Sequence, residues 1–142
     1  MRINRYVLDA NVWISYIITQ TEFKLTEAIV EKNLSIFICD ELLEELERVF
    51  RYPHLSQYNI NIPIALNFIK TISVTRKLTY PIKRYIKDDI NDDYIVALAL
   101  QTDAGFITSG DRHILSEKEE LEAKYKKLKI LTKSEFERKV MK

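Results

Sequence analysis

The chain has 142 residues, 46% of them hydrophobic and 30% charged, so we expect residues 1–142 to form a single globular domain with one core. Its 22 basic and 21 acidic residues nearly balance, and the net charge of +1 gives no sign of a strongly basic nucleic-acid binder. No apolar run approaches the roughly 18 residues of a membrane span, and no secretory signal is recognisable. The single cysteine, Cys39, cannot form an internal disulfide, so we expect a cytoplasmic protein without a membrane partner.

Apolar periodicity and turn residues divide the chain into alternating strands and helices. In chain order the patterns predict a strand at residues 3–8, helices at 11–19 and 22–33, a strand at 35–39, helices at 40–51 and 63–71, a strand at 73–75, a helix at 91–104, a strand at 105–109, a strand within 126–132 and a short helix ending at 140. This alternation favours an α/β fold with a mainly parallel sheet and right-handed crossovers.

Three residues are expected to mark helix starts. Asp40 precedes "ELLEELERVF" and is predicted to cap that helix, because an aspartate side chain accepts bonds from free N–H groups. Pro63 suits a first helical turn. Ser134 is predicted to cap the last helix. The helix at 91–104 is apolar on nearly every side, so we expect it to be buried.

Acidic residues follow or precede several of these elements. Asp9 ends the first strand, Asp111 comes just after "FITSG", and Asp92 and Asp93 open the buried helix. In an open parallel sheet, binding sites form beyond the carboxyl ends of the strands. These acids are therefore expected on the functional edge of the sheet.

A glutamate of the helix at 40–51 is expected to join them. At 100° per residue, one arc of this helix is apolar and forms its core face, containing Leu42, Leu43, Leu46, Val49 and Phe50. Glu45 borders this arc, whereas Glu44 points nearly opposite, into water. Glu47 borders the other edge of the arc and is a weaker candidate. Glu45 can therefore lie at the rim of the core, where a ligand carboxylate belongs.

Gathered carboxylates repel one another and need a cation. Oxygen-only ligands suit Mg²⁺ or Mn²⁺, whereas Cys39, His54 and His113 lack the spacing of a zinc site. A divalent ion held by carboxylates and water is the usual apparatus of phosphoryl transfer. Each acid also has a plainer interpretation, as a turn residue, a surface charge, a helix cap or a loop charge. For Asp89, a loop charge is a stronger interpretation than a functional role.

Four segments together resemble the PIN-domain family of metal-dependent nucleases. They are "VLDANVWIS" (7–15), "CDELLEELERVF" (39–50), "DDINDDYIVALALQTDAGFITSGDRHIL" (88–115) and "ILTKSEFE" (130–137). Within the family the chain is most similar to the VapC-type toxins of toxin–antitoxin pairs. It departs from them at "SGD", where Thr-Gly-Asp is more frequent, and at Ile90 and Asn91, where proline is common.

The resemblance implies roles for individual residues. It implies an acidic site made of Asp9, Glu45, Asp92 and Asp111. Asp9 and Asp92 would be the most direct metal ligands, with Asp111 beside them. Asn11 would support Asp9 or touch the substrate, and Ser109 would orient the site by its hydroxyl. Asp89 and Asp93 would act as supporting or alternating ligands.

The resemblance also implies a three-layer α/β/α sandwich with a short, mainly parallel sheet, and metal-dependent cleavage of RNA. Related members form homodimers, and the toxins are silenced by a small antitoxin protein. A housekeeping RNA-processing nuclease would share the same acids and is an open alternative. So is a non-catalytic binding module of the same fold. A haloacid-dehalogenase-like phosphatase is disfavoured, because Asn11 occupies the position of its second aspartate and cannot act as its acid or base.

Basic and aromatic residues near the third acidic segment are candidate RNA contacts. Arg112 follows Asp111 and could bind phosphate. Tyr80, Tyr85 and Tyr94 interleave with basic residues at Lys83, Arg84 and Lys87, a mixture that suits stacking and backbone contacts on a single strand. An ordinary amphipathic segment would look the same.

Overall fold

The computed structural model describes residues 4–85 and 93–141. Its elements in chain order are β1 (Arg5–Leu8), α1 (Ala10–Ile18), α2 (Glu22–Lys32), β2 (Ser35–Ile38), α3 (Asp40–Phe50), the 3₁₀ helix η2 (Pro53–Tyr58), α4 (Ile62–Ile72), β3 (Val74–Thr75), α5 (Asp93–Gln101), β4 (Phe106–Thr108), α6 (Arg112–Ser116), α7 (Lys118–Lys124), β5 (Lys129–Leu131) and α8 (Lys133–Val140). Among the described residues, every helix is too short or too polar to span a lipid bilayer.

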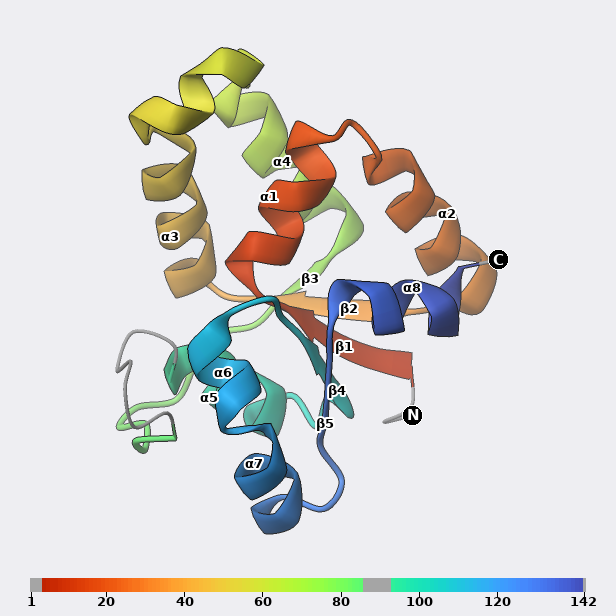
Figure 1. Cartoon of the computed structure of the whole chain (residues 1–142), viewed down its shortest axis with the longest axis vertical. Helices are drawn as coiled ribbons and strands as arrows, with labels where there is room; N and C mark the ends of the chain where they lie inside the picture. Colours follow the sequence, from red (N-terminus) through yellow and green to blue (C-terminus); the bar gives the residue numbers. More distant parts are fainter. Residues whose placement is uncertain (1–3, 86–92, 142) are drawn as a thin grey trace.

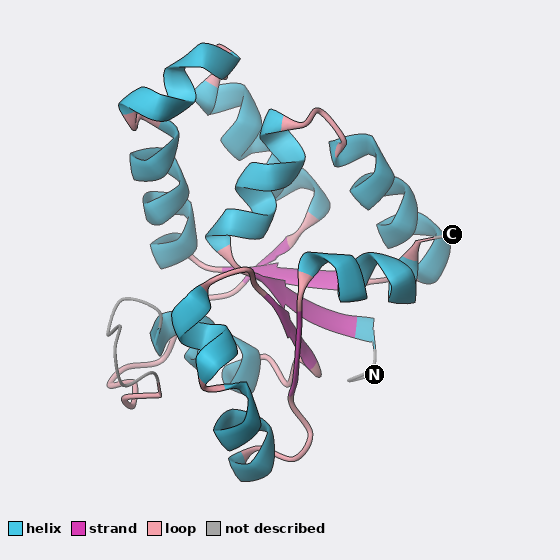
Figure 2. Ribbon diagram, viewed as in Figure 1, coloured by secondary structure: helices cyan, strands magenta, loops and turns pink. Residues whose placement is uncertain are grey.

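The five strands form one parallel sheet in the order β3-β2-β1-β4-β5. Helices α1 to α4 lie on one side of it, and α5 to α7 lie on the other (Figures 1 and 2). The predicted α/β/α sandwich with a parallel sheet is thus confirmed. In the central pair, Leu8 of β1 is in register with Thr108 of β4, so the residues that follow these two strands emerge side by side.

The core surrounds β1 and α5. On one face of the sheet, Tyr6 stacks on Phe106 at 4.8 Å and meets the edge of Phe136 from α8 at 5.2 Å. On the opposite side, all residues of α5 from Asp93 to Ala99 are buried. The expectation of an almost wholly buried helix is therefore correct, because α5 lies between the sheet and the loops that follow β3.

The sequence prediction missed three short elements and misplaced two helix caps. It did not include η2, α6 or α7, which bury little apolar surface: one residue of each is buried, namely Leu55, Ile114 and Leu121. Asp40 is not the cap of α3 but its first residue, because Cys39 has the extended backbone of an N-cap. Ser134 does not cap α8 either.

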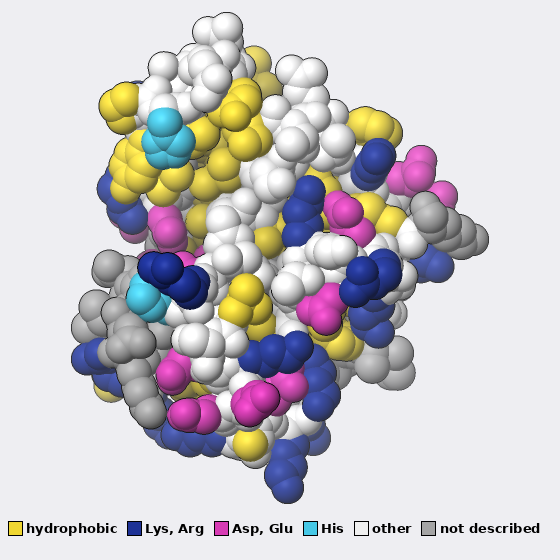
Figure 3. Space-filling model, in the orientation of Figure 1, with side chains coloured by type: hydrophobic (Ala, Val, Ile, Leu, Met, Phe, Trp, Pro, Cys, Tyr) yellow, Lys and Arg dark blue, Asp and Glu magenta, His cyan; other side chains and the backbone are white. Residues whose placement is uncertain are grey.

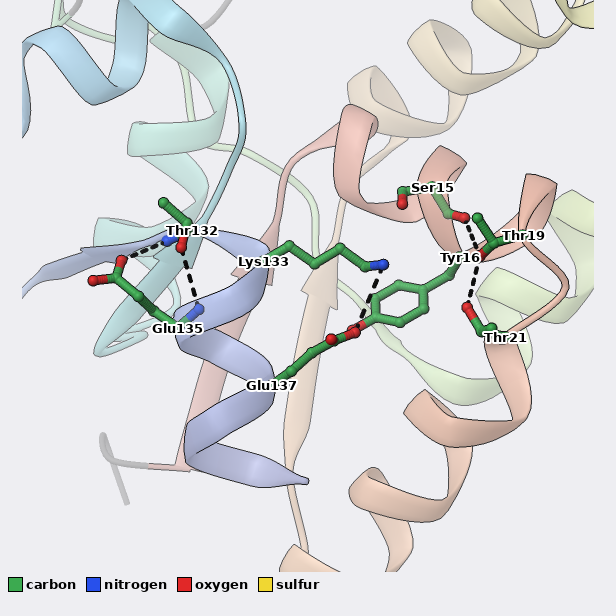
Figure 4. A network of polar contacts seen from close by, with 8 residues as sticks. All are labelled: Ser15, Tyr16, Thr19, Thr21, Thr132, Lys133, Glu135 and Glu137. Carbon is green, nitrogen blue, oxygen red and sulfur yellow. Dashed lines mark hydrogen bonds and ion pairs between the residues drawn. The ribbon is translucent and has the colours of Figure 1, made fainter. Parts of the chain in front are cut away.

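Helix α8 begins at a capping box instead. The Thr132 hydroxyl accepts the Glu135 backbone N–H at 3.2 Å, and the Glu135 carboxylate accepts the Thr132 N–H at 2.9 Å (Figure 4). The same helix is attached to α1, because the buried Tyr16 hydroxyl donates to Glu137 at 2.7 Å. Lys133 lies 4.3 Å from the centre of the Tyr16 ring and 3.6 Å from Glu137.

Thr132→Ala is expected to destabilise the protein by about 1 kcal/mol and to lower its melting temperature by about 3 °C, because it removes the cap of α8. Thermal unfolding followed by circular dichroism measures the shift. Ser134→Ala is the matched control, since Ser134 is exposed and bonds only Arg138, at 3.2 Å. An equal loss in both variants would contradict the assignment of the cap.

Candidate active site

Asp9 occupies the junction between β1 and α1. It is the N-cap of α1, and its Oδ1 accepts the Ala10 N–H at 2.8 Å. Its own N–H donates to the Thr108 carbonyl at 2.9 Å, which ties the junction to the neighbouring strand β4. The carboxylate is 2% exposed. It is therefore fixed at the carboxyl edge of the sheet, as the sequence predicts.

Two polar side chains join Asp9 to the loop that follows β4. The buried Ser109 hydroxyl donates to Asp9 Oδ2 at 2.8 Å and accepts the Asp111 N–H at 2.9 Å. Asn11 Nδ2 lies 3.4 Å from the same Oδ2, and Asn11 Oδ1 accepts the Gly110 N–H at 2.9 Å. Asn11 and Ser109 thus connect the ends of the two strands through their side chains.

Asp111 caps α6 on the other side of this junction. Its Oδ1 accepts the N–H groups of His113 at 2.7 Å and of Ile114 at 3.3 Å. Within the described parts of the chain, its Oδ2 accepts no hydrogen bond and is available to a ligand. Asp111 is half-buried, and its backbone N–H is held by the same Ser109 hydroxyl that donates to Asp9.

Glu45 approaches from α3. It is half-buried, whereas Glu44 and Glu47 are exposed, and Glu47 forms a surface ion pair with Arg51 at 3.1 Å. The Tyr94 hydroxyl from α5 donates to Glu45 Oε1. Burial and the nearby charge of Glu45 raise the pKa of Tyr94 strongly, so its hydroxyl keeps its proton and acts as a donor.

The charges of Glu45 and Asp111 act on Asp9. The pKa of Asp9 is raised from 3.8 to about 6, mainly by burial and in smaller part by the charges of Glu45 and Asp111, against the lowering effect of the bonds from Ser109 and Ala10. No lysine or arginine in the described segments pairs with Asp9. In Figure 3 the surface is hollowed between α3 and α6, and acidic side chains are visible in the hollow. Carboxylates from three segments of the chain therefore bring negative charge to this edge of the sheet.

The sequence profile of the PIN domain family matches residues 5–113, from the start of β1 to the start of α6. The chain belongs to the PIN domain family. PIN domains are nucleases that generally use divalent metal ions. The match includes Asp9, Glu45 and Asp111, so the acids that converge at the sheet edge lie inside the family's own region.

A solved structure has the same fold. It is the crystal structure of VapBC2 from Rickettsia felis bound to a DNA fragment from their promoter, with a TM-score of 0.53 and 15% sequence identity. The match covers 90% of this chain and 98% of that one. At this identity the likeness supports the PIN fold and nothing finer. Among curated proteins, no sequence matches this PIN domain.

The donor set of the PIN domain suits a divalent cation, although the described residues do not complete a site. The donors are carboxylate oxygens, which Mg²⁺ and Mn²⁺ prefer, and Asp9 has a charge that a cation would compensate. In residues 4–85 and 93–141, no group of three or more acidic, histidine or cysteine side chains is close enough to hold a metal ion. The predicted ligands Asp92 and Asp89 lie outside the described residues.

Other predicted residues take different positions. Asp93 is 2% exposed, and its carboxylate accepts the Tyr85 N–H at 2.8 Å and lies 3.4 Å from Arg84 Nε, so it connects these two residues to the start of α5. Arg112 is exposed at the start of α6, next to Asp111. The sequence interpretation of Tyr94 as an RNA contact is not supported, because its ring is 9% exposed. Its proximity to Glu45 could not be read from the sequence.

Ser109→Ala is expected to lower the unfolding free energy at pH 7 by about 1–3 kcal/mol. The substitution leaves Asp9 Oδ2 without its closest donor and the Asp111 N–H without an acceptor, and it raises the pKa of Asp9 further. Urea denaturation measures the loss. Ser116→Ala is the control, since the exposed Ser116 hydroxyl also donates one hydrogen bond, to the His113 carbonyl. Equal losses in the two variants would mean that the Ser109 hydroxyl, which links Asp9 to Asp111, contributes no more to stability than a surface hydrogen bond.

Proposed function

We propose that this PIN domain is an endoribonuclease that hydrolyses RNA phosphodiester bonds with Mg²⁺ or Mn²⁺. The observation that carries the proposal is the convergence of Asp9, Asp111 and Glu45, with Asp9 buried and without a basic partner among the described residues. An arrangement that raises the pKa of its central carboxylate is unfavourable unless a cation binds there.

Asp9 and Asp111 are the proposed metal ligands, together with Asp92. The bound ion would activate a water molecule and stabilise the leaving oxygen. Ser109 links the Asp9 carboxylate to the Asp111 backbone N–H, and Asn11 fixes the loop at Gly110. Glu45 would supply a further carboxylate from α3, and the exposed Arg112 would contact a substrate phosphate.

Incubation of the purified protein with labelled single-stranded RNA tests this function. We expect cleavage in the presence of Mn²⁺ or Mg²⁺, none in EDTA, and recovery when excess metal is added back. Single-stranded DNA of the same sequence tests the preference for RNA. Absence of cleavage under all metal conditions, together with absence of metal binding by calorimetry, would favour a non-catalytic binding module.

We also propose that the protein is the toxin of a toxin–antitoxin pair, working as a homodimer in the cytoplasm. The support is the PIN fold that it shares with the VapBC2 structure. Expression alone should then arrest growth, and co-expression of a small protein encoded beside it should restore growth. If expression leaves growth unchanged while the purified protein cleaves RNA, a housekeeping nuclease is the better interpretation.

A further inference from the structure

Two tyrosine hydroxyls donate to two glutamates of α3, and only one of these contacts is at the acidic site. Tyr80 donates to Glu41, and Tyr94 donates to Glu45. The glutamates are four residues apart, so they lie one above the other on the helix. Tyr80 is 58% exposed and belongs to a surface loop, whereas Tyr94 is 9% exposed and belongs to α5.

Tyr94 is held more rigidly than the side chain it contacts. It is the second residue of α5, and its neighbours from Ile95 to Ala99 are all buried, so the helix cannot shift without disturbing the core. A tyrosine ring has only two side-chain torsions. Glu45 has three and lies half-exposed at the edge of α3. The contact therefore fixes the glutamate, and the tyrosine is the anchor.

Glu45 has a physical reason to leave the site in the absence of this contact. The charge of Glu45 raises the pKa of Asp9, as that of Asp111 does, and like charges repel at short range. Turning toward solvent would relieve the repulsion and hydrate the carboxylate. A neutral hydroxyl donor on the buried side opposes this movement without adding a charge to the metal site.

We propose that Tyr94 is a positioning residue of the nuclease site, whose hydroxyl holds the Glu45 carboxylate toward Asp9 in the orientation that RNA hydrolysis requires. This inference rests on the proposed nuclease function. Tyr94 does not contact the RNA, because its ring is buried, and it acts only through Glu45. Partners of this kind, which orient a site carboxylate from behind, typically change metal affinity or activity by about ten- to a hundred-fold when removed.

Tyr94→Phe removes the hydroxyl and keeps the ring. We expect kcat for RNA cleavage to fall about ten- to a hundred-fold, with the KM for RNA changed by less than about two-fold, because the substrate does not touch this residue. Tyr16→Phe is the matched control: it removes the bond of another buried tyrosine hydroxyl to a glutamate, Glu137 of α8, and should leave kcat unchanged. Wild-type activity in Tyr94→Phe, or an equal loss in Tyr16→Phe, would overturn the proposal.

A double variant separates positioning from a general structural role. In a Glu45→Gln background, Tyr94→Phe should cause no further loss of kcat, because the group it positions is already gone. If the loss persists at full size in that background, Tyr94 acts through the fold and the proposal is wrong. The comparison also separates the two proposals: if wild type and Glu45→Gln cleave equally, the assignment of the site fails before Tyr94 is considered.

Tyr94→Lys supplies a rescue arm. A lysine ammonium reaches about as far from the backbone as the phenol hydroxyl and can donate to Glu45, but it lacks the aromatic ring. We expect this variant to keep more activity than Tyr94→Phe. Should Tyr94→Phe fail to fold, Tyr94→Lys is assayed at saturating Mn²⁺, which offsets the charge that the ammonium adds beside the site. Retained cleavage then supports positioning by a donor, and a folded, metal-bound but inactive protein overturns it.

Discussion

Asp9→Asn is expected to abolish metal-dependent RNA cleavage, with kcat/KM reduced by at least about a hundred-fold. Asparagine has nearly the same shape, and its carbonyl oxygen can still accept the Ala10 N–H that caps α1. It has no charge to hold a cation at the junction of β1 and β4. The measurement is the cleavage rate on single-stranded RNA with saturating Mn²⁺, together with Mn²⁺ binding by calorimetry.

Asp40→Asn is the control for this experiment. Asp40 is also an aspartate at the start of a helix that follows a strand, but its side chain is exposed. Its substitution should leave cleavage unchanged. If Asp9→Asn cleaves RNA at the wild-type rate while folded, the acidic edge of the sheet is not the active site.

The succession of strands and helices along the chain and the position of Asp9 could be predicted because they depend on local patterns. A buried strand followed by an acid and an apolar helix places that acid at the carboxyl edge of a parallel sheet. The same reasoning places Asp111, and the period of α3 distinguishes Glu45 from Glu44. Each of these inferences needs only one element and its neighbours in the sequence.

The features that could not be predicted depend on contacts between distant elements. The Tyr94 hydroxyl meets Glu45 across 49 residues of sequence, and neither residue type signals the other. Asp93 carries the same charge as the predicted ligands, yet its carboxylate is taken by the backbone of Tyr85. Thr132 and Ser134 are equally good caps by composition, and the capping box with Glu135 decides between them.

These contacts suggest a division of roles in the site. Backbone geometry sets the positions of Asp9 and Asp111, since both are helix caps at the ends of neighbouring strands. Ser109 and Asn11 orient the Asp9 carboxylate, whereas the backbone N–H groups of His113 and Ile114 orient that of Asp111. The site is therefore organised before any cation arrives, and the repulsion among its acids is present in the free protein.

That repulsion should be measurable as a pH-dependent difference in stability. In EDTA, the unfolding free energy of Asp9→Asn minus that of the wild type is expected to increase by about 2 kcal/mol from pH 4 to pH 7. The pKa of Asp9 is raised from 3.8 to about 6 in the folded protein. Between these values the unfolded wild-type chain releases the proton while the folded protein retains it, so wild-type stability falls as the pH rises. Asparagine does not titrate and is spared this loss.

Urea denaturation at several pH values gives the two unfolding free energies, and taking their difference cancels most contributions of the other titratable groups. A difference that stays constant from pH 4 to pH 7 would contradict a raised pKa for Asp9.

Mn²⁺ adds the decisive comparison at pH 7. A cation that binds only the folded wild type at a hundred times its dissociation constant stabilises it by about 2.7 kcal/mol, which is close to the expected cost of the Asp9 charge. The Asp9→Asn variant should gain little from the metal. A wild-type protein that is destabilised without metal and recovers with it would show that the buried charge of Asp9 is retained for binding a cation.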